Sequence, residues 1–98
     1  MVVIRRLIWD DWNIAHIARH GIDPSEVEQV CHNDPFVVQT YGGRLRLIGE
    51  NTSGRALTVI IAIKTTDGDY YPITARPASA KERTLYRREV KTDDDQAA

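Results

Sequence analysis

Hydrophobic and polar positions follow two different periods along the chain, and each change of period predicts the border of an element. The segment VVIRRLIWD, residues 2–10, is dominated by β-branched and other apolar residues and predicts a first strand. Asp10 or Asp11 can cap a helix over residues 11–20, because a carboxylate there accepts the free amide hydrogens of the first turn. Gly21 suits the left-handed position that ends such a helix.

A second helix and a run of strands follow. The segment DPSEVEQVCHN, residues 23–33, has a proline and acids in its first turn, which is typical of a helix N-terminus. The turn sequences GG, TSG and DG then separate strands by short hairpin connections, so consecutive strands are expected to pair antiparallel. One of these strands contains the unbroken apolar run 59–63, which predicts a central strand buried on both faces. The predicted strands are PFVVQTY (35–41), RLRLIGENT (44–52), RALTVIIAIKTT (55–66) and YYPITAR (70–76).

The end of the chain supplies the last helix. Ser79 to Glu82 spells S-A-K-E, a capping box, and the helix is expected to run to about Lys91. The segment TDDDQAA, residues 92–98, has nothing to bury and predicts a disordered acidic tail. The elements predict an α+β fold in the order β-α-α-β-β-β-β-α, with a mainly antiparallel sheet packed against helices and a single domain over residues 1–91.

Length and composition exclude several classes of protein. The 98 residues suffice for one core, and the apolar fraction of 42% is that of an ordinary folded protein. No stretch approaches the roughly 20 apolar residues of a membrane span, and Arg5 and Arg6 interrupt the apolar N-terminus, unlike a signal peptide. Cys31 is the only cysteine, so no internal disulfide can form. We therefore expect a cytoplasmic protein in which Cys31 is a small buried apolar residue.

The net charge of −1 hides a division along the chain. Residues 10–34 carry six acids against one arginine, whereas residues 76–91 carry six cations against two glutamates. Ten of the thirteen cations are arginine, whose planar fork suits phosphate groups. The C-terminal block is therefore the candidate surface for a polyanion, although a solvated helix face would have the same composition.

The first predicted helix has two kinds of side chain. Ile14, Ile17 and Ala18 predict an apolar stripe toward the core, whereas Asn13, His16 and His20 share another side. We expect Asn13 and His16 to be solvated, and His20 either to be solvated or to project into a cleft, where it can titrate near neutrality. Trp9 and Trp12, at a strand end and in the first helical turn, are expected to belong to the core rather than to stack on bases.

Other chemistries find little support in the sequence. His16 and His20 have a spacing that can hold zinc, but the glutamate of the H-E-x-x-H motif and a third ligand are missing, so we expect no metal. No phosphate-binding loop or nucleophile elbow is present, and the capping role explains Ser79. Covalent catalysis through serine or cysteine is therefore not expected.

The remaining histidine, arginine, glutamate and tyrosine suit the cleavage of RNA. Attack by the neighbouring 2′-hydroxyl needs a base, cations that stabilise the additional negative charge at phosphorus, and an acid for the leaving oxygen. Arg76 ends a strand at the rim of the sheet, and Arg83 and Tyr86 follow one and two turns into the last helix. Arg87 lies beside Arg83 at a spacing of four residues.

Three segments resemble the BrnT family of type II toxins. They are IWDDWNIAHIARHGI, IGENTSGRALTVIIAI and YPITARPASAKERTLY, and they occur in the family's order over about residues 7–88. The resemblance implies a fold similar to RelE-type ribonucleases. It also implies a metal-independent endoribonuclease, without a cofactor, that cuts RNA, free or on the ribosome, by 2′-hydroxyl attack and thereby inhibits translation. A cognate antitoxin with a ribbon-helix-helix segment would neutralise it and would alone contact operator DNA.

The resemblance carries over to particular residues of this chain. His20, Arg76, Glu82 and Tyr86 are the expected catalytic residues: Arg76 clamps phosphate, His20 or Tyr86 acts as acid or base, and Glu82 either orients Arg76 or only closes the capping box. Many relatives have lysine where this chain has Arg19, so the charge persists but proton transfer there would be lost. The expected RNA-binding residues are Arg19, Arg44, Arg83 and Arg87.

A non-catalytic function stays open as the alternative. The same basic helix could grip an acidic segment of an antitoxin and serve only in a repressor complex. An unrelated small enzyme or scaffold is the third possibility.

Overall fold

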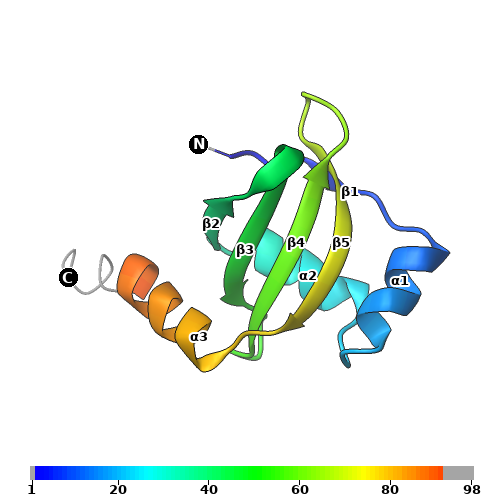
Figure 1. Cartoon of the computed structure of the whole chain (residues 1–98). Coiled ribbons are helices and arrows are strands. Elements are labelled where there is room, and N and C mark those ends of the chain that lie inside the picture. Colours follow the sequence, from blue (N-terminus) through cyan, green and yellow to red (C-terminus); the bar gives the residue numbers. More distant parts are fainter. Residues whose placement is uncertain (1, 92–98) are drawn as a thin grey trace.

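A computed structural model describes residues 2–91, which form a five-stranded sheet with the strand order β1-β5-β4-β3-β2 (Figure 1). The short β1 pairs parallel with β5, and all other neighbours pair antiparallel. The predicted α+β class with a mainly antiparallel sheet is therefore confirmed. The strands are β1 (Arg6–Leu7), β2 (Phe36–Gln39), β3 (Arg44–Glu50), β4 (Ala56–Ile63) and β5 (Asp69–Pro77).

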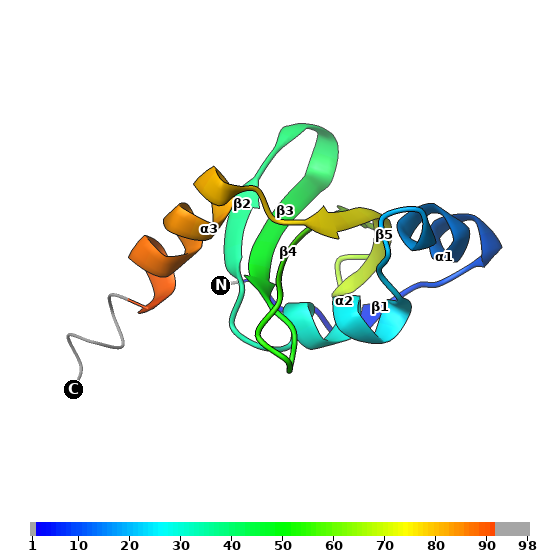
Figure 2. The ribbon, with the colours of Figure 1, turned by 90° about the horizontal axis from the view of Figure 1, so that it is seen from below.

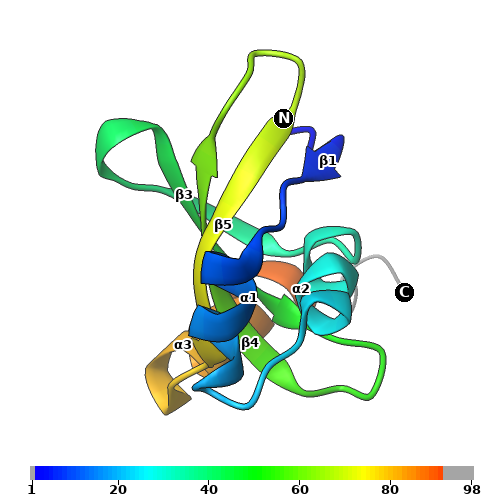
Figure 3. The same cartoon turned by 90° about the vertical axis from the view of Figure 1, so that its right-hand side faces the viewer.

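The three α-helices lie on different sides of this sheet. They are α1 (Asp11–Ala18), α2 (Pro24–Cys31) and α3 (Ala80–Tyr86). Figure 1 shows α2 behind the strands, and Figure 2 shows α2 and α3 on opposite sides of the sheet. In Figure 3, α1 lies along the outer edge of β5. The sheet therefore has one face covered by α2 and a second face, partly covered by α3, which we call the open face.

Side chains form one apolar cluster on each face. The larger cluster joins α1 and α2 to the sheet, and it contains Leu7, Ile17, Ile22, Val27, Val30, Cys31, Leu45, Leu47, Leu57, Val59, Ile61 and Ala75. The smaller cluster joins α3 to the open face through Ile48, Ala78 and Tyr86. Cys31 is buried, as predicted, and burial raises the pKa of its thiol to about 12, so this cysteine is unreactive.

The first strand is much shorter than predicted from the apolar run 2–10. Only Arg6 and Leu7 have the strand assignment, although Arg5 also donates its amide hydrogen to the carbonyl of Gly68. The Arg5 guanidinium donates to both oxygens of the buried Asp69, at 2.9 and 3.0 Å. The N-terminal segment is therefore held to the β4–β5 connection as much by an ion pair as by strand pairing.

The capping of α1 is confirmed, but the predicted faces of this helix are wrong. Asp10 accepts from the amide of Asn13, and Gly21 has the left-handed φ of 73° after the helix has ended at residue 18. Asn13 is completely buried. Its side-chain amide donates to the carbonyls of Ile8 and Pro72 at 3.0 Å each, and these hydrogen bonds compensate for the loss of water.

Of the three apolar side chains predicted to face the core from α1, only one does so. Ile17 is buried as predicted, but Ile14 is 40% exposed and Ala18 is exposed. Trp12 is 57% exposed and does not belong to the core, contrary to prediction. Trp9 is half-buried against the larger cluster, and its indole N–H donates to Glu28.

The central position of β4 is confirmed, but its burial on both faces is not. Leu57, Val59 and Ile61 point into the larger cluster and are fully buried. On the open face Ile60 and Ala62 are only half-buried. The helix α3 is too short to cover this whole face.

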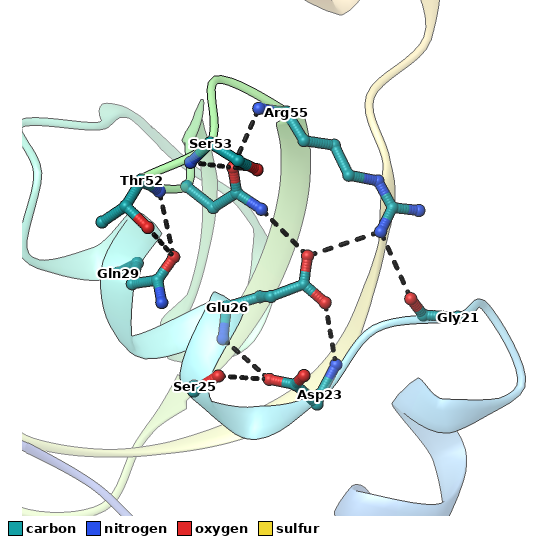
Figure 4. Close-up of polar contacts among 9 residues, drawn as sticks. Gly21, Asp23, Ser25, Glu26, Gln29, Thr52, Ser53 and Arg55 are labelled. Carbon is teal, nitrogen blue, oxygen red and sulfur yellow. Dashed lines mark hydrogen bonds and ion pairs between the residues drawn. The ribbon is translucent and has the colours of Figure 1, made fainter.

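A buried asparagine fixes the β3–β4 hairpin on α2 (Figure 4). The side-chain oxygen of Asn51 accepts from the amides of Ser53 and Arg55 and from the hydroxyl of Ser53. Its amide nitrogen donates to Glu26 at 2.9 Å, and Arg55 donates to the carbonyl of Gly21. The NTSGR sequence, residues 51–55, therefore ties a hairpin to the start of α2.

The last helix begins at the predicted capping box, in which Ser79 and Glu82 bond each other's backbone amides. The α-helix ends at Tyr86, and a π-helical turn continues it over Arg87–Lys91. The predicted acidic tail 92–98 lies outside the described residues. None of the helices within residues 2–91 has the length and apolar composition to cross a membrane.

Candidate active site

Three neighbouring strands bring polar side chains together on the open face of the sheet. Thr58 on β4 pairs with Arg76 on β5, and Arg46 on β3 lies one row away, opposite Ile60. Because side chains alternate between the two faces of a strand, Thr58 and Arg76 point away from the core that holds Val59 and Ala75. The sheet thus presents two guanidinium groups on the two sides of a buried threonine.

An irregularity in β5 makes this arrangement possible. The pairing with β4 shifts between Ile60 and Ile61, so that Ile73 is left as an additional residue. Pro72 and Ala75, three positions apart, can therefore both face Ile61 and Val59 on the core side. The bulge places Arg76 on the open face just before the strand ends.

Glu82 at the start of α3 binds both arginines. Its carboxylate accepts two hydrogen bonds from Arg76, Nη1 to Oε1 at 2.7 Å and Nη2 to Oε2 at 2.9 Å. Oε1 also accepts from the backbone amide of Ser79 at 2.9 Å, and Arg46 Nη1 lies 3.7 Å from Oε2. Glu82 therefore closes the capping box and orients Arg76 with the same carboxylate, so the two alternatives predicted for it are realised together.

These contacts fix the charge of the pair. The hydrogen bonds from Arg76 are the main cause that lowers the pKa of Glu82 to about 2, and the Ser79 amide adds to the effect. The same hydrogen bonds raise the pKa of Arg76. Glu82 is thus ionised throughout the physiological range and is a weak base, since a proton acceptor works best with a pKa near the working pH. An orienting role for Glu82 fits this environment better than proton transfer.

Arg46 is a site residue that the sequence analysis did not single out. Its guanidinium points toward Glu82, and its side chain is 37% exposed. Its Nε is a buried polar atom that has no hydrogen-bond partner within residues 2–91, and the hydroxyl of the buried Thr58 lies near Glu82, whose pKa it helps to lower. The signal was present in the strand RLRLIGE, where arginines at alternate positions are interleaved with buried leucines and must share the opposite face.

A shallow pocket lies beside this group. It has a volume of about 280 Å³, and its walls come from β3 and from the first turns of α3. Lys81 adds an exposed cation to its rim, whereas Ile48 and Leu85 form the apolar side. An anionic group in this pocket would meet Arg46 and Lys81, beside the Glu82 carboxylate that binds Arg76.

The predicted RNA-binding arginines lie around this face. Arg44 is exposed and belongs to the same side of β3 as Arg46, two residues away. Arg83 is exposed on α3, and its Nη1 donates to the carbonyl of Ala78. Arg87 is exposed on the turn that follows α3.

Tyr86 does not lie on the surface predicted for it. The residue is only 5% exposed, because its ring packs with Ile48 and Ala78 in the smaller cluster. The expectation that Arg76, Arg83 and Tyr86 share one exposed surface is therefore wrong for Tyr86.

His20 lies at the end of α1, outside the Arg76–Glu82 pair. It makes no hydrogen bond or ion pair with Arg76 or Glu82 in the described part of the chain, and its ring contacts His16 edge-on at 6.0 Å. The contacts Asp10–Tyr71 and Asn13–Pro72 show that α1 and β5 run in the same direction. Counted from the contact between Asn13 and Pro72, His20 lies about 10 Å further along the helix direction, and Arg76 lies about 13 Å further along the strand.

The end of α1 therefore lies level with the end of β5, as Figures 1 and 3 also show. The exposed Arg19 belongs to the same end of α1. Within residues 2–91 no three His, Cys, Asp or Glu side chains form a group that could hold a metal ion.

Comparison with known proteins gives a structural relative. No family model matches the chain, and no curated protein matches its sequence. The crystal structure of the Brucella abortus ribonuclease toxin BrnT superimposes with a TM-score of 0.61 and is 28% identical. The match covers 76% of this chain and 96% of the toxin. The chain thus has a BrnT-like fold.

Proposed function

We propose that this chain is the toxin of a type II toxin–antitoxin pair and acts as a metal-independent endoribonuclease. The observation that carries the proposal is the Arg46–Glu82–Arg76 group on the open face of a fold shared with a ribonuclease toxin. Two guanidiniums and one carboxylate leave a net positive charge of one, and Lys81 adds another beside it. Such a group suits the phosphate that is attacked by a 2′-hydroxyl.

Arg76 and Arg46 have the role of stabilising charge. During attack by the 2′-hydroxyl, additional negative charge develops on the phosphoryl oxygens, and preorganised cationic donors favour that state most. Glu82 holds the fork of Arg76 in one plane through two hydrogen bonds, so little ordering is required when the RNA binds. The buried Nε of Arg46 and hydroxyl of Thr58 are further polar atoms next to this place.

His20 is the candidate for proton transfer. An imidazole can both accept and donate a proton, and the end of α1 lies level with the end of β5, the strand that carries Arg76. Glu82 has too low a pKa for this work, and Tyr86 is buried. The RNA backbone would run over Arg44, Arg83 and Arg87, with Arg19 beside His20.

The partners follow from the same proposal. RNA, free or on the ribosome, is the substrate, and its cleavage would inhibit translation. A cognate antitoxin with a ribbon-helix-helix segment would cover the basic open face and would supply all contacts to operator DNA. The exposed cations of the open face and of α3 are the surface that an acidic antitoxin segment would neutralise.

The chemistry of the products tests this function. The purified chain is expected to cut single-stranded RNA in the presence of a chelator, leaving 2′,3′-cyclic phosphate and 5′-hydroxyl ends. RNA with 2′-O-methyl groups should stay intact, because it lacks the attacking hydroxyl. Cutting that needs a divalent metal, or that leaves 5′-phosphate ends, would contradict the mechanism.

The burial of Tyr86 favours a second candidate, a non-catalytic module that only binds the antitoxin in a repressor complex. Overexpression separates the two functions. Growth arrest that is relieved by co-expression of the neighbouring gene product supports the ribonuclease. Undisturbed growth together with formation of a stable complex supports the binding module.

A further inference from the structure

The outer side of α1 carries an exposed stack of aromatic rings. Trp12 is 57% exposed, and its ring lies parallel to that of His16, with centroids 4.9 Å apart and an angle of 8° between the planes. His20 follows with its edge toward His16. The spacing of four residues puts all three rings on one side of the helix.

This exposure of a tryptophan is not a result of poor packing nearby. The core contact of α1 is made by Ile17 and by the hydrogen bonds of Asn13, both fully buried, so Trp12 is not needed there. The His16 ring holds the indole in one orientation and leaves the other indole face toward solvent. A flat, exposed and oriented ring is the form of a base-stacking site.

The stack leads toward the candidate active site. Because α1 runs beside β5 in the same direction, the order Trp12, His16, His20 parallels the direction from Tyr71 to Arg76. Asp10, the residue that caps the helix, accepts hydrogen bonds from Tyr71 and from the start of α1. The exposed charges of the helix itself, Asp11 and Arg19, balance each other.

We propose that Trp12, supported by His16, stacks on a base of the single-stranded RNA whose phosphate is held by Arg76 and Arg46. This inference rests on the proposed function and adds to it a second contact for the substrate, away from the scissile bond. It favours RNA over a protein partner because the ligand surface is a pair of parallel rings. The exposed aliphatic side chain of this helix, Ile14, lies on the opposite side and is not part of the stack.

Quenching of tryptophan fluorescence tests the contact directly. The probe is a short single-stranded RNA with 2′-O-methyl groups, which can bind but cannot be cut. We expect it to quench the wild-type chain and the matched control Ile14→Ala, and to bind Trp12→Leu roughly tenfold more weakly, with little quenching. The remaining tryptophan, Trp9, is half-buried and bonded to Glu28, so it supplies the constant background.

Kinetics separate this inference from the proposed function. If both hold, Trp12→Leu raises KM for RNA roughly tenfold and changes kcat little, whereas Ile14→Ala changes neither. Quenching without any cleavage would sustain the stacking site and overturn the nuclease. Cleavage with equal KM in wild type and Trp12→Leu would overturn the stacking site and sustain the nuclease. Absence of quenching by the probe, with Trp12 protected only by the antitoxin, would overturn the base contact in favour of a protein interface.

Discussion

Glu82 shows how one side chain can serve local structure and chemistry together. Its carboxylate satisfies the amide of Ser79 at the start of α3 and binds the fork of Arg76. The helix start is therefore tied to the position of Arg76, the arginine proposed to stabilise the phosphate. A change in either contact is expected to disturb the other.

The substitution Glu82→Gln separates these roles, because glutamine can also close a capping box but carries no charge. Lowering the pKa of Glu82 from 4.5 to about 2 contributes about 3 kcal/mol of stability. The pKa is depressed, so this stability is present above pH 4.5 and is lost as the pH falls toward 2. We expect Glu82→Gln to be less stable at pH 7 and to lose less stability on acidification, as measured by urea unfolding.

The matched control for this prediction is Glu89→Gln, which removes the same charge from an exposed position after α3. It should unfold with the acid dependence of the wild-type chain. Equal acid dependence of Glu82→Gln and wild type would show that the Arg76–Glu82 pair does not stabilise the fold.

At the level of single residues, the sequence predicts what depends on neighbours in the chain. The S-x-x-E pattern was enough to place Ser79 and Glu82 in a capping box. Asn13 was predicted to be solvated because its partners, the carbonyls of Ile8 and Pro72, come from segments whose position only the folded sheet defines. Tyr86 was misplaced for the same reason, since Ile48 and Ala78 cover it.

Among the elements, the β3–β4 hairpin has the most specific construction. Asn51 is 6% exposed and makes three accepted hydrogen bonds within the turn and one donated bond to α2. Thr52 adds two hydrogen bonds to Gln29, which join the turn to α2 at a second place (Figure 4). This hairpin supports the strands that carry Arg46 and Thr58.

Replacement of Asn51 by alanine is expected to cost about 2–3 kcal/mol of unfolding free energy, because it removes the acceptor of the Ser53 and Arg55 amides and the hydrogen bond of a buried side chain to Glu26. The control is Asn33→Ala, which removes one exposed hydrogen bond of 3.3 Å and should cost about 0.5 kcal/mol. Urea unfolding of both variants with unchanged m-values measures the difference. Equal losses in the two variants would show that the turn is not a structural clamp.

The borders of the elements show the limits of periodicity. Hairpins, capped helix starts and the central strand were predicted well, because turn residues and continuous apolar runs mark them in the sequence. The first strand was predicted too long, since β1 finds a partner only at Asp69 and Tyr70. Pairing between segments that are far apart in the sequence leaves no local pattern from which the length of a strand can be predicted.

In the whole molecule, many acidic side chains form hydrogen bonds within the fold, whereas many basic side chains are exposed. Asp10 and Asp23 cap helices, and hydrogen bonds lower the pKa of both carboxyls. Glu26 and Glu28 bind side chains of Asn51 and of Trp9. The acidic block of the sequence is thus largely structural, whereas the basic block surrounds the open face. A chain with almost no net charge can in this way offer a basic surface to RNA.

Arg76, oriented by Glu82, is proposed to stabilise the phosphate during RNA cleavage. The most direct test is the initial rate of cleavage of single-stranded RNA in a chelator by wild type, Arg76→Ala, Arg76→Lys and Lys64→Ala. Arg76→Lys keeps the charge beside Glu82 and so protects the fold, but it loses the planar fork. Lys64→Ala removes the same charge at the other end of β4, where Lys64 lies over the ring of Tyr71.

We predict that both Arg76 variants, checked for native circular dichroism, cut RNA roughly 100- to 1,000-fold more slowly, whereas Lys64→Ala cuts at the wild-type rate. Cleavage by folded Arg76→Ala at the wild-type rate would show that Arg76 does not stabilise the phosphate during the reaction.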